Sequence, residues 1–320
     1  MAEPFENPAD IIEFVRKFQD IKIILTAIEL KVFTTLDTHM LTLKEISEKL
    51  DVEEDSLSRL LNALVSLDLL HKVKDKYYNS HFAKTYLNEN SNEFVYSLKH
   101  YCNTFERWSD LTGIIKPDFE GNDFSEAFIS AMHYRAKKTA DLIPLMINRD
   151  NIRRIIDIGG GSGVFLISFL KQLPEATGVL LDLPKIIPIS KKFVKNEGME
   201  ERISFIEGSY HDADFGEGYD LAILSAILHI NSALENEKLI QKTYNSLNKG
   251  GKILINEFIL NEDETSPKRA VLFSINMLVG TKKGRSYKYS EIESWLKNTG
   301  FGHIELKPMG NDASLIVGEK

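Results

Sequence analysis

The sequence predicts an α/β protein in which a mostly helical N-terminal part precedes a doubly wound domain with a mainly parallel sheet. Three observations carry this prediction. Up to about residue 110, apolar residues recur at the spacing of helix faces. From Ile152 onward, short β-rich runs alternate with helical segments, an order typical of a sheet covered on both faces. Residues 115–124 contain Pro, Gly and Asn, as linkers do, so we expect domains at 1–112 and 113–320.

The first domain is expected to have the layout of a winged helix. Its helix-spaced apolar residues begin with Ile11, Ile12, Phe14, Val15, Phe18, Ile21, Ile24, Leu25 and Ile28. Thr42 and Glu45 have the spacing of a capping box, and Asp51 with Glu54 predicts a second one ahead of the apolar run 57–67. Residues 70–78 have the pattern of a short β-ribbon. Helix, turn, helix and ribbon therefore follow one another.

A winged helix can bind DNA, so the charges of its second helix matter. Between residues 53 and 68 four acidic side chains accompany one basic side chain: Glu53, Glu54, Asp55, Asp68 and Arg59. A helix in a DNA groove needs several Lys or Arg for phosphates and base edges. The lysines at 72, 74 and 76 are interpreted as a solvated face of the ribbon. We expect a packing or dimerisation module and rank a ligand-sensing regulator below an enzyme.

Composition narrows the class further. The net charge of −8 disfavours non-specific binding to nucleic acid or anionic membranes. The single cysteine, Cys102, excludes an internal disulfide and a cysteine-rich zinc site, and no metal is expected. The N-terminus lacks the features of a signal peptide, and no apolar run approaches the roughly 20 residues of a membrane span. We expect a cytoplasmic protein.

The second domain is expected to begin with a helix from about Ser125 to Asn148 that is broken or bent near Pro144. Seven strands are expected after it, at 153–158, 177–182, 203–207, 219–225, 251–257, 303–307 and 313–318. Helices are expected to start near Ser162, Ile186, Glu235 and Ser290. Strands and helices in this order predict a Rossmann-like sheet.

A glycine-rich turn follows the first of these strands, in the sequence Asp157-Ile-Gly-Gly-Gly-Ser-Gly163. Gly159 and Gly161 allow a tight turn beside main-chain N–H groups of the next helix. The dinucleotide fingerprint requires a third glycine at the position that Val164 occupies. Asp157 at the strand end is unfavourable for a pyrophosphate, but it suits the ammonium group of S-adenosylmethionine, through water or backbone. The turn therefore predicts S-adenosylmethionine as the cofactor and S-adenosylhomocysteine as the product.

Other cofactor residues are expected at the ends of the neighbouring strands, where ligands bind in such sheets. Asp182 ends the second strand and is expected to accept the ribose hydroxyls, with a helix N-cap as the alternative role. Ser209 and Tyr210 follow the third strand, where the adenine is expected. Leu183 and Ser225 complete the predicted cofactor site.

His229 follows the fourth strand, and Glu257 ends the fifth. Adjacent parallel strands end at the same edge of a sheet, so we expect these two side chains to lie close together. A histidine with a pKa near ~6.5 accepts a hydroxyl proton at neutral pH, and a carboxylate fixes its tautomer. This pair predicts a general base, His229, assisted by Glu257, for methyl transfer to oxygen. His133 and His211 are expected at the substrate side.

These motifs together resemble the S-adenosylmethionine-dependent O-methyltransferases, which include plant caffeic acid O-methyltransferase, acetylserotonin O-methyltransferase and bacterial relatives. The resemblance extends over nearly the whole chain, and the motifs that carry it lie between the glycine turn and Gly300-Phe301. It implies a homodimer formed by the winged-helix domain. It also implies a small aromatic hydroxyl acceptor, with Met132 and Met277 as residues that clamp it. Phe128 and Asn276 are expected beside them, on helices around 125–146 and in a loop at 273–285.

The chain departs from the family pattern at three positions. His229 is followed by Ile230 and Asn231 instead of Asp and Trp. A second Glu near the base is replaced by Gly284, and an Asp at the adenine strand end by Ser209. Methylation at carbon or nitrogen and a non-catalytic role therefore stay open as alternatives.

Overall fold

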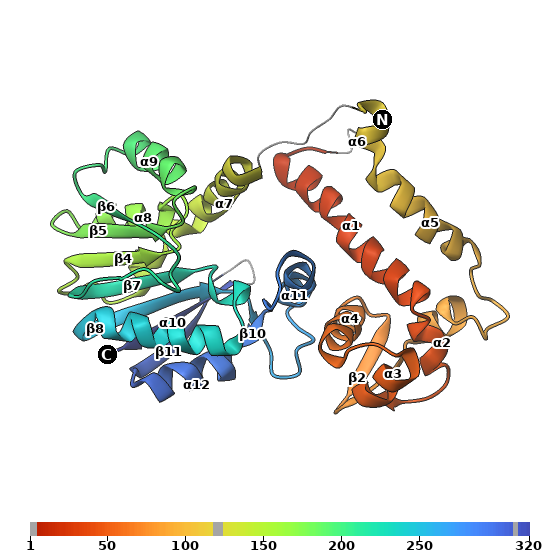
Figure 1. Ribbon diagram of the computed structural model, residues 1–320. Helices are drawn as coiled ribbons and strands as arrows, with labels where there is room; N and C mark the ends of the chain where they lie inside the picture. Colours follow the sequence, from red (N-terminus) through yellow and green to blue (C-terminus); the bar gives the residue numbers. More distant parts are fainter. Residues whose placement is uncertain (1–4, 118–123, 310–312) are drawn as a thin grey trace. The chain divides into compact units, whose positions relative to one another are not determined.

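The computed structural model describes residues 5–117, 124–309 and 313–320, and the chain divides into two compact units (Figure 1). The first unit comprises residues 1–120 together with 263–279, and the second comprises residues 121–262 and 280–320. Part of the predicted linker, residues 118–123, lies outside the described residues. Within the described part of the chain, no helix is both long and apolar enough to cross a membrane.

The first unit is mostly helical. Its helices are α1 (Pro8–Glu29), α2 (Val32–Leu36), α3 (Leu43–Leu50), α4 (Glu54–Ser66), the π-helix η1 (Ala83–Leu87), α5 (Ser97–Ser109), α6 (Leu111–Ile115) and α11 (Lys268–Gly280). Its strands are β1 (Leu41–Thr42), β2 (Leu70–Val73) and β3 (Lys76–Asn79), paired in the order β1-β3-β2. The expected sequence of helix, turn, helix and ribbon is present, with β1 as an additional strand.

Capping explains where the two central helices begin. The Thr42 side chain accepts the main-chain N–H of Glu45, and the Glu45 carboxylate accepts that of Thr42 at 2.7 Å, as predicted. The second predicted cap is wrong. Asp51 ends α3 in the left-handed region with φ of 54°, and Glu53 caps α4 by accepting the main-chain N–H of Asp55 and Ser56. Asp51 completes one helix and therefore does not start the next.

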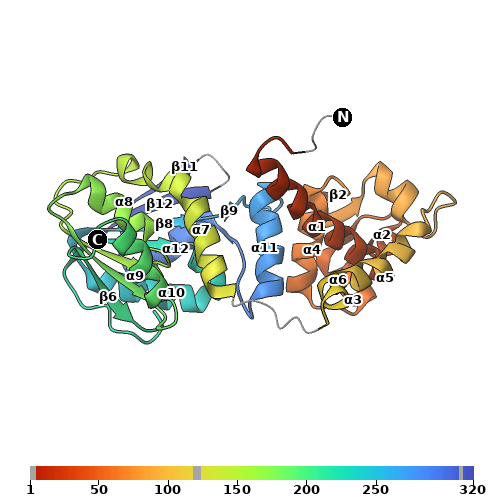
Figure 2. The ribbon, with the colours of Figure 1, turned by 90° about the horizontal axis from the view of Figure 1, so that it is seen from above.

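Helix α11 is far from the other elements of the first unit in sequence but lies beside them in the fold. The Lys268 ammonium group is 3.3 Å from the Asp20 carboxylate of α1, and the Lys72 ammonium group donates to the Asp263 carbonyl oxygen at 2.7 Å. Both views show α11 next to α1 and α4 (Figures 1 and 2). The loop expected at 273–285 is therefore wrong up to Gly280, because that stretch is helical.

The second unit is built on a seven-stranded sheet. Its strands have the order β11-β12-β8-β7-β4-β5-β6 and comprise β4 (Arg154–Ile158), β5 (Thr177–Asp182), β6 (Ile203–Glu207), β7 (Tyr219–Ser225), β8 (Leu247–Glu257), β11 (Gly302–Met309) and β12 (Ala313–Glu319). The five strands from β8 to β6 are parallel, whereas β12 and β11 are antiparallel. The short strands β9 (Ile259–Leu260) and β10 (Tyr287–Lys288) form a separate parallel pair. A mainly parallel sheet was expected and is confirmed.

Helices cover both faces of this sheet. They are α7 (Phe124–Ala140), α8 (Val164–Gln172), α9 (Ile187–Asn196), α10 (Ala233–Ser246) and α12 (Tyr289–Thr299), with the 3₁₀ turns η2 (Ile143–Met146) and η3 (Leu228–Ile230). Adjacent residues of β4 enter opposite cores: Ile155 packs with α8 and α9, and Ile156 with α10 and α12. In Figure 1, α10 and α12 lie in front of the sheet. Burial on both faces explains the apolar strands.

The helix expected at 125–148 ends earlier than predicted. Helix α7 stops at Ala140, and Pro144 lies within η2, a short 3₁₀ turn. Proline has no N–H for the helix ladder, and its ring restricts the residue before it. The interruption was predicted correctly, but it begins several residues before the proline.

Candidate active site

The glycine turn between β4 and α8 is folded tightly over the strand that precedes it. Gly159 and Gly161 have φ of 68° and 55°, a region that favours glycine. A Cβ atom at Gly160 would lie 2.8 Å from the Asp157 carboxyl group. At Gly159 the space for a side chain is bounded by Ile227 and Tyr210. A side chain at Gly159 would collide with Ile227, so only glycine fits at this position of the turn.

The Asp182 side chain, at the end of β5, accepts hydrogen bonds that hold this turn in place. Its Oδ2 accepts the main-chain N–H of Gly161 at 2.8 Å, and its Oδ1 accepts that of Leu183 at 2.7 Å. Burial raises the pKa of Asp182 above its ordinary value. Helix α9 begins at Ile187 with Ile186 as its N-cap, so the alternative role of Asp182 as a helix cap is wrong. Each carboxylate oxygen keeps a second lone pair for a ligand hydroxyl.

Asp157 lies beneath the turn and does not face an open crevice. Its residue is 1% exposed, and its Oδ2 has no hydrogen-bond partner among the described residues. Burial, and after it the nearby charge of Asp182, raises the pKa of Asp157 to about 7. A carboxyl group in this place can act on a ligand only through the turn that covers it.

The other predicted cofactor residues lie at the same edge of the sheet. The Ser209 hydroxyl accepts the main-chain N–H of His211 at 3.2 Å. The Tyr210 hydroxyl donates to the Asn231 side chain at 2.9 Å, and the Ser225 hydroxyl accepts from Asn256 at 3.0 Å. Leu183 is partly exposed beside Asp182. Ser209 and Tyr210 follow β6, Leu183 follows β5, and Ser225 is the last residue of β7, as predicted from the strand pattern.

His229 and Glu257 are in contact, as the order of strands predicts. Strands β7 and β8 run parallel, with Ser225 paired to Asn256, and His229 lies in η3 just beyond β7. The Nδ1 atom of His229 is 2.7 Å from Oε2 of Glu257, and Oε1 of Glu257 accepts the main-chain N–H of Leu228 at 2.8 Å. Both side chains are buried. A carboxylate that accepts a hydrogen bond from Nδ1–H selects the neutral tautomer in which Nε2 carries no proton.

One residue expected near the substrate braces the glycine turn instead. The Nδ1 atom of His133 on α7 is 3.0 Å from the Ser162 hydroxyl, and its ring stacks on Phe193 with centroids 4.4 Å apart. Burial lowers the pKa of His133, which favours the neutral ring. From α9, the Ser190 hydroxyl donates to the Gly161 carbonyl at 2.5 Å. The spacing of residues in the sequence did not predict the contacts of His133 and Ser190. The other histidine expected near the substrate, His211, is exposed and its ring lies beside that of Tyr210.

The four predicted acceptor-binding residues are distributed over two helices in different units. Phe128 and Met132 lie one turn apart on α7, and both are exposed. Asn276 and Met277 lie on α11, where Met277 is buried and Asn276 is exposed. Outward apolar side chains such as Phe128 and Met132 are available for contact with an apolar molecule.

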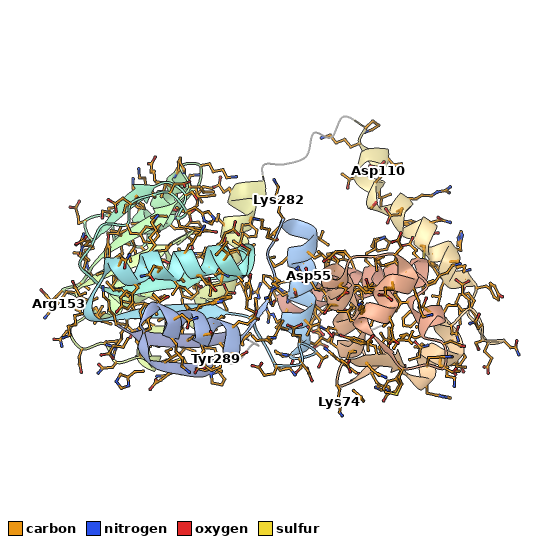
Figure 3. The ribbon with its side chains drawn as sticks, turned by 60° about the horizontal axis from the view of Figure 1, so that its bottom comes forward. Asp55, Lys74, Asp110, Arg153, Lys282 and Tyr289 are labelled. Atoms are coloured by element: carbon orange, nitrogen blue, oxygen red, sulfur yellow. The ribbon has the colours of Figure 1, made fainter. Side chains whose placement is uncertain are left out.

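The charge pattern of α4 is also visible in the structure. Asp55, labelled in Figure 3, forms an ion pair with Arg59, the single basic residue of that helix. Lys74, also labelled there, lies in the turn between β2 and β3. Among the described residues, no three histidine, cysteine or carboxylate side chains gather as metal ligands would.

Comparison with known proteins places these features in context. Residues 99–302 match the O-methyltransferase domain, and residues 12–89 match the O-methyltransferase dimerisation domain. The chain is 28% identical over 295 residues to 3-hydroxy-5-methyl-1-naphthoate 3-O-methyltransferase of Streptomyces sahachiroi, covering 87% of this chain and 85% of that protein. It is 29% identical to acetylserotonin O-methyltransferase of Gallus gallus, covering 99% of each chain. The structure of an O-methyltransferase family 2 protein from Planctomyces limnophilus in complex with apigenin is similar, with a TM-score of 0.85, 22% identity, and coverage of 100% of this chain and 98% of that chain.

Proposed function

This chain belongs to the S-adenosylmethionine-dependent O-methyltransferase family, and from this premise we propose that it methylates a hydroxyl group of a small aromatic molecule, with His229 as the general base. The observation that carries the proposal is the 2.7 Å contact between His229 Nδ1 and Glu257 Oε2 at the ends of two adjacent parallel strands. A base oriented by a buried carboxylate is the arrangement that proton removal from a hydroxyl requires.

We assign the cofactor to the edge of the sheet around the glycine turn. The second lone pairs of Asp182, beside the glycine turn at the carboxyl ends of β4 and β5, fit a nucleoside with ribose hydroxyls. The residues that would hold it are Asp157, Gly159, Gly161, Asp182, Leu183, Ser209, Tyr210 and Ser225. When bound, S-adenosylmethionine supplies a methyl group on a positively charged sulfur.

His229 and Glu257 divide the proton chemistry between them. Nε2 of His229 takes the proton of the acceptor hydroxyl, and the electron pair of the broken O–H bond stays on the oxygen, which becomes nucleophilic. The Glu257 carboxylate stabilises the imidazolium that forms, because its Oε2 already accepts a hydrogen bond from Nδ1. Oε1 is held by the Leu228 N–H, so the carboxylate cannot rotate freely away from the ring.

The acceptor is expected to be apolar and aromatic in the part that contacts Phe128 and Met132, whose side chains are exposed on α7. The relatives named above act, by their names, on a hydroxynaphthoate and on acetylserotonin. Both molecules carry a ring, and we propose the same class for this chain.

The test is a screen with methyl-labelled S-adenosylmethionine and a panel of phenols that includes hydroxynaphthoates, N-acetylserotonin and apigenin. We expect an O-methylated product, and we expect His229→Ala to bind S-adenosylmethionine as the wild type does while losing turnover by about 10²- to 10⁴-fold. Full turnover by His229→Ala would mean that the histidine is not the base, and a product methylated at carbon or nitrogen would replace the proposal with the corresponding alternative.

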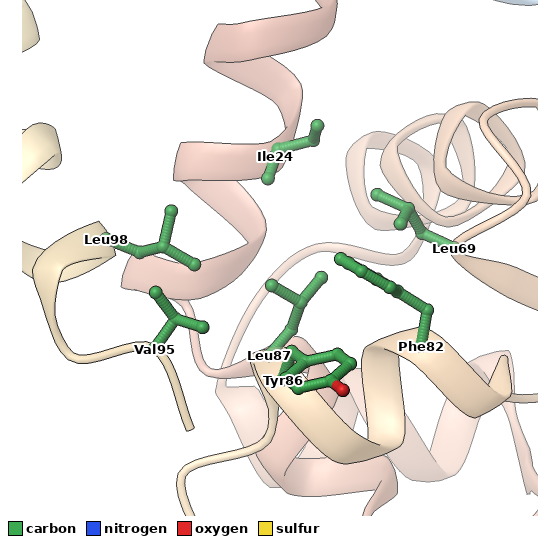
Figure 4. A pocket seen from close by; sticks show the side chains of 7 residues that line it. All are labelled: Ile24, Leu69, Phe82, Tyr86, Leu87, Val95 and Leu98. Carbon is green, nitrogen blue, oxygen red and sulfur yellow. The ribbon is translucent and has the colours of Figure 1, made fainter. Parts of the chain in front are cut away.

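We further propose that the chain acts as a homodimer through the first unit, which carries the match to the dimerisation domain. Outward-facing apolar side chains lie along α1: Ile11, Ile12, Phe14, Val15, Phe18 and Ile21. The same unit has an apolar cavity of about 430 Å³ lined by Ile24, Leu69, Phe82, Tyr86, Leu87, Val95 and Leu98 (Figure 4). Apolar surface of this kind on one protomer is stabilised when a second copy covers it.

A further inference from the structure

The segment that carries His229 has little backbone structure of its own. It connects β7 to α10 through Ala226, which has φ of 59°, and the three residues of η3. Its main-chain hydrogen bonds at the far end are long, 3.2 Å from the Ile230 N–H to the Ile227 carbonyl and 3.2 Å from the Asn231 N–H to the Leu228 carbonyl. Side chains must therefore contribute to holding the imidazole in one place.

Asn231, two residues after His229, supplies these contacts. Its Oδ1 accepts from the Tyr210 hydroxyl at 2.9 Å, and its Nδ2 donates to Oδ1 of Asn236 at 3.1 Å. Its main-chain oxygen accepts from the Tyr287 hydroxyl at 2.5 Å. Asn231 is 3% exposed, and Asn236 is fully buried. The residue thus joins the end of β6, the first turns of α10 and β10 around the histidine segment.

The direction of this chain of hydrogen bonds is determined at one end. Asn236 uses its Nδ2 to bind the Leu228 carbonyl at 2.9 Å, and a carbonyl oxygen can only accept. Oδ1 of Asn236 is therefore the atom that accepts from Asn231, which leaves Oδ1 of Asn231 to accept from Tyr210. Leu228 is held on its carbonyl side by Asn236 and on its N–H side by Glu257. No orientation of the two amides other than this one satisfies every group.

We propose that Asn231 is a positioning residue for His229, and that through Tyr210 it links the strand end assigned to the adenine with the base. This inference rests on the proposed function of His229. The chain has Ile230-Asn231 where the family has Asp-Trp, and of these two residues Asn231 belongs to the buried amide network whereas Ile230 is exposed. Buried amides that are fully bonded specify one arrangement, because any other leaves a polar group without a partner.

The first test compares two variants with a matched control. Asn231→Leu removes both side-chain hydrogen bonds at similar volume, and Tyr210→Phe removes one hydroxyl. Tyr219→Phe is the control, because it also removes a tyrosine hydroxyl, one that is more deeply buried and donates to the Phe215 carbonyl at 2.7 Å at the start of β7. The readout is the low-field NMR signal of the His229 Nδ1 proton, assigned by its absence in His229→Ala. This measurement requires no acceptor.

We expect Asn231→Leu to lose this signal, Tyr210→Phe to weaken it and Tyr219→Phe to keep it. With an acceptor from the screen, kcat of Asn231→Leu is expected to fall about 10- to 100-fold while the Kd for S-adenosylmethionine changes less than about twofold. A folded Asn231→Leu with the wild-type signal and kcat would overturn the inference. If that variant does not fold, Tyr210→Phe decides by the same measurements. Unimpaired turnover by His229→Ala would instead reject the proposed function and leave the positioning result intact.

Discussion

A Cβ atom at Gly284 would collide with the main-chain oxygen of His229, so the loop after α11 contacts the backbone of His229 directly. The Ile230 carbonyl lies 3.0 Å from the same position, and the Gly284 N–H donates to the Thr281 hydroxyl at 2.8 Å. A glutamate, which the family pattern has here, does not fit this loop conformation. Glycine at position 284 therefore allows the loop to pack closely against the segment that carries His229.

Gly284→Ala is expected to lower turnover. The added methyl group must displace either the loop or the His229 segment, and a displacement of about 1 Å costs on the order of 10²-fold in rate. Steady-state kinetics with the acceptor from the screen measures this. Gly280→Ala is the matched control, since its Cβ atom would meet nothing within 4 Å among the described residues. Equal kcat values for the two variants would show that the close contact between Gly284 and the His229 main chain does not affect turnover.

Asp182→Asn is expected to weaken binding of S-adenosylmethionine. The amide retains one acceptor where the carboxylate has two, and its NH₂ group then faces a main-chain N–H of Gly161 or Leu183. Loss of a charge-assisted hydrogen bond costs about 1.5–3 kcal/mol, which is about 10- to 100-fold in Kd. Calorimetry measures this change.

The control for that variant is Asp220→Asn. The Asp220 carboxylate also accepts two main-chain N–H groups, those of Arg153 and Arg154 at 2.9 Å each, but at the opposite end of the sheet. We expect Asp220→Asn to lower the stability of the fold and to leave the Kd for S-adenosylmethionine unchanged. If both variants weaken S-adenosylmethionine binding equally, the Asp182→Asn variant loses affinity because the fold is less stable and not because Asp182 contacts the cofactor.

The Asp157 carboxyl group is expected to make stability depend on pH. Its pKa is raised to about 7 by burial and by Asp182, so the folded protein holds this proton more firmly than the unfolded chain, where the pKa is about 3.9. Its contribution to stability is present below about pH 4 and is lost as the pH rises through 7. Denaturant unfolding of the wild type and Asp157→Asn at several pH values isolates this contribution. We expect the wild type to lose stability relative to the variant between pH 4 and 7, and a constant difference would contradict the assignment.

Charged substitutions on α1 are expected to separate the proposed dimer. Phe14 and Phe18 are 59% and 52% exposed within one chain, so Phe14→Glu with Phe18→Glu places two carboxylates in a surface that a partner is proposed to cover. Light scattering after size-exclusion chromatography is expected to shift from dimer to monomer mass. Leu145→Glu is the control, because Leu145 is equally exposed but lies outside the dimerisation-domain match. A dimer that persists in the double variant would place the interface elsewhere.

The residue pattern alone determined the class of fold and the position of the proposed base, His229. Strand bounds were predicted closely for β4 to β7, because apolar runs bounded by turns are a local property of the sequence. The contact between His229 and Glu257 also followed from strand order, because adjacent parallel strands end at one edge.

Only the tertiary structure decided how those residues are supported. Asn231 contacts Tyr210, Asn236 and Tyr287, which are 21, 5 and 56 positions away in the chain, and no periodicity encodes such hydrogen bonds. The same holds for Asp157, whose burial depends on how the glycine turn folds back over it. Local spacing specifies helices, strands and their ends, whereas the partners of a buried polar group depend on packing between segments that are distant in sequence.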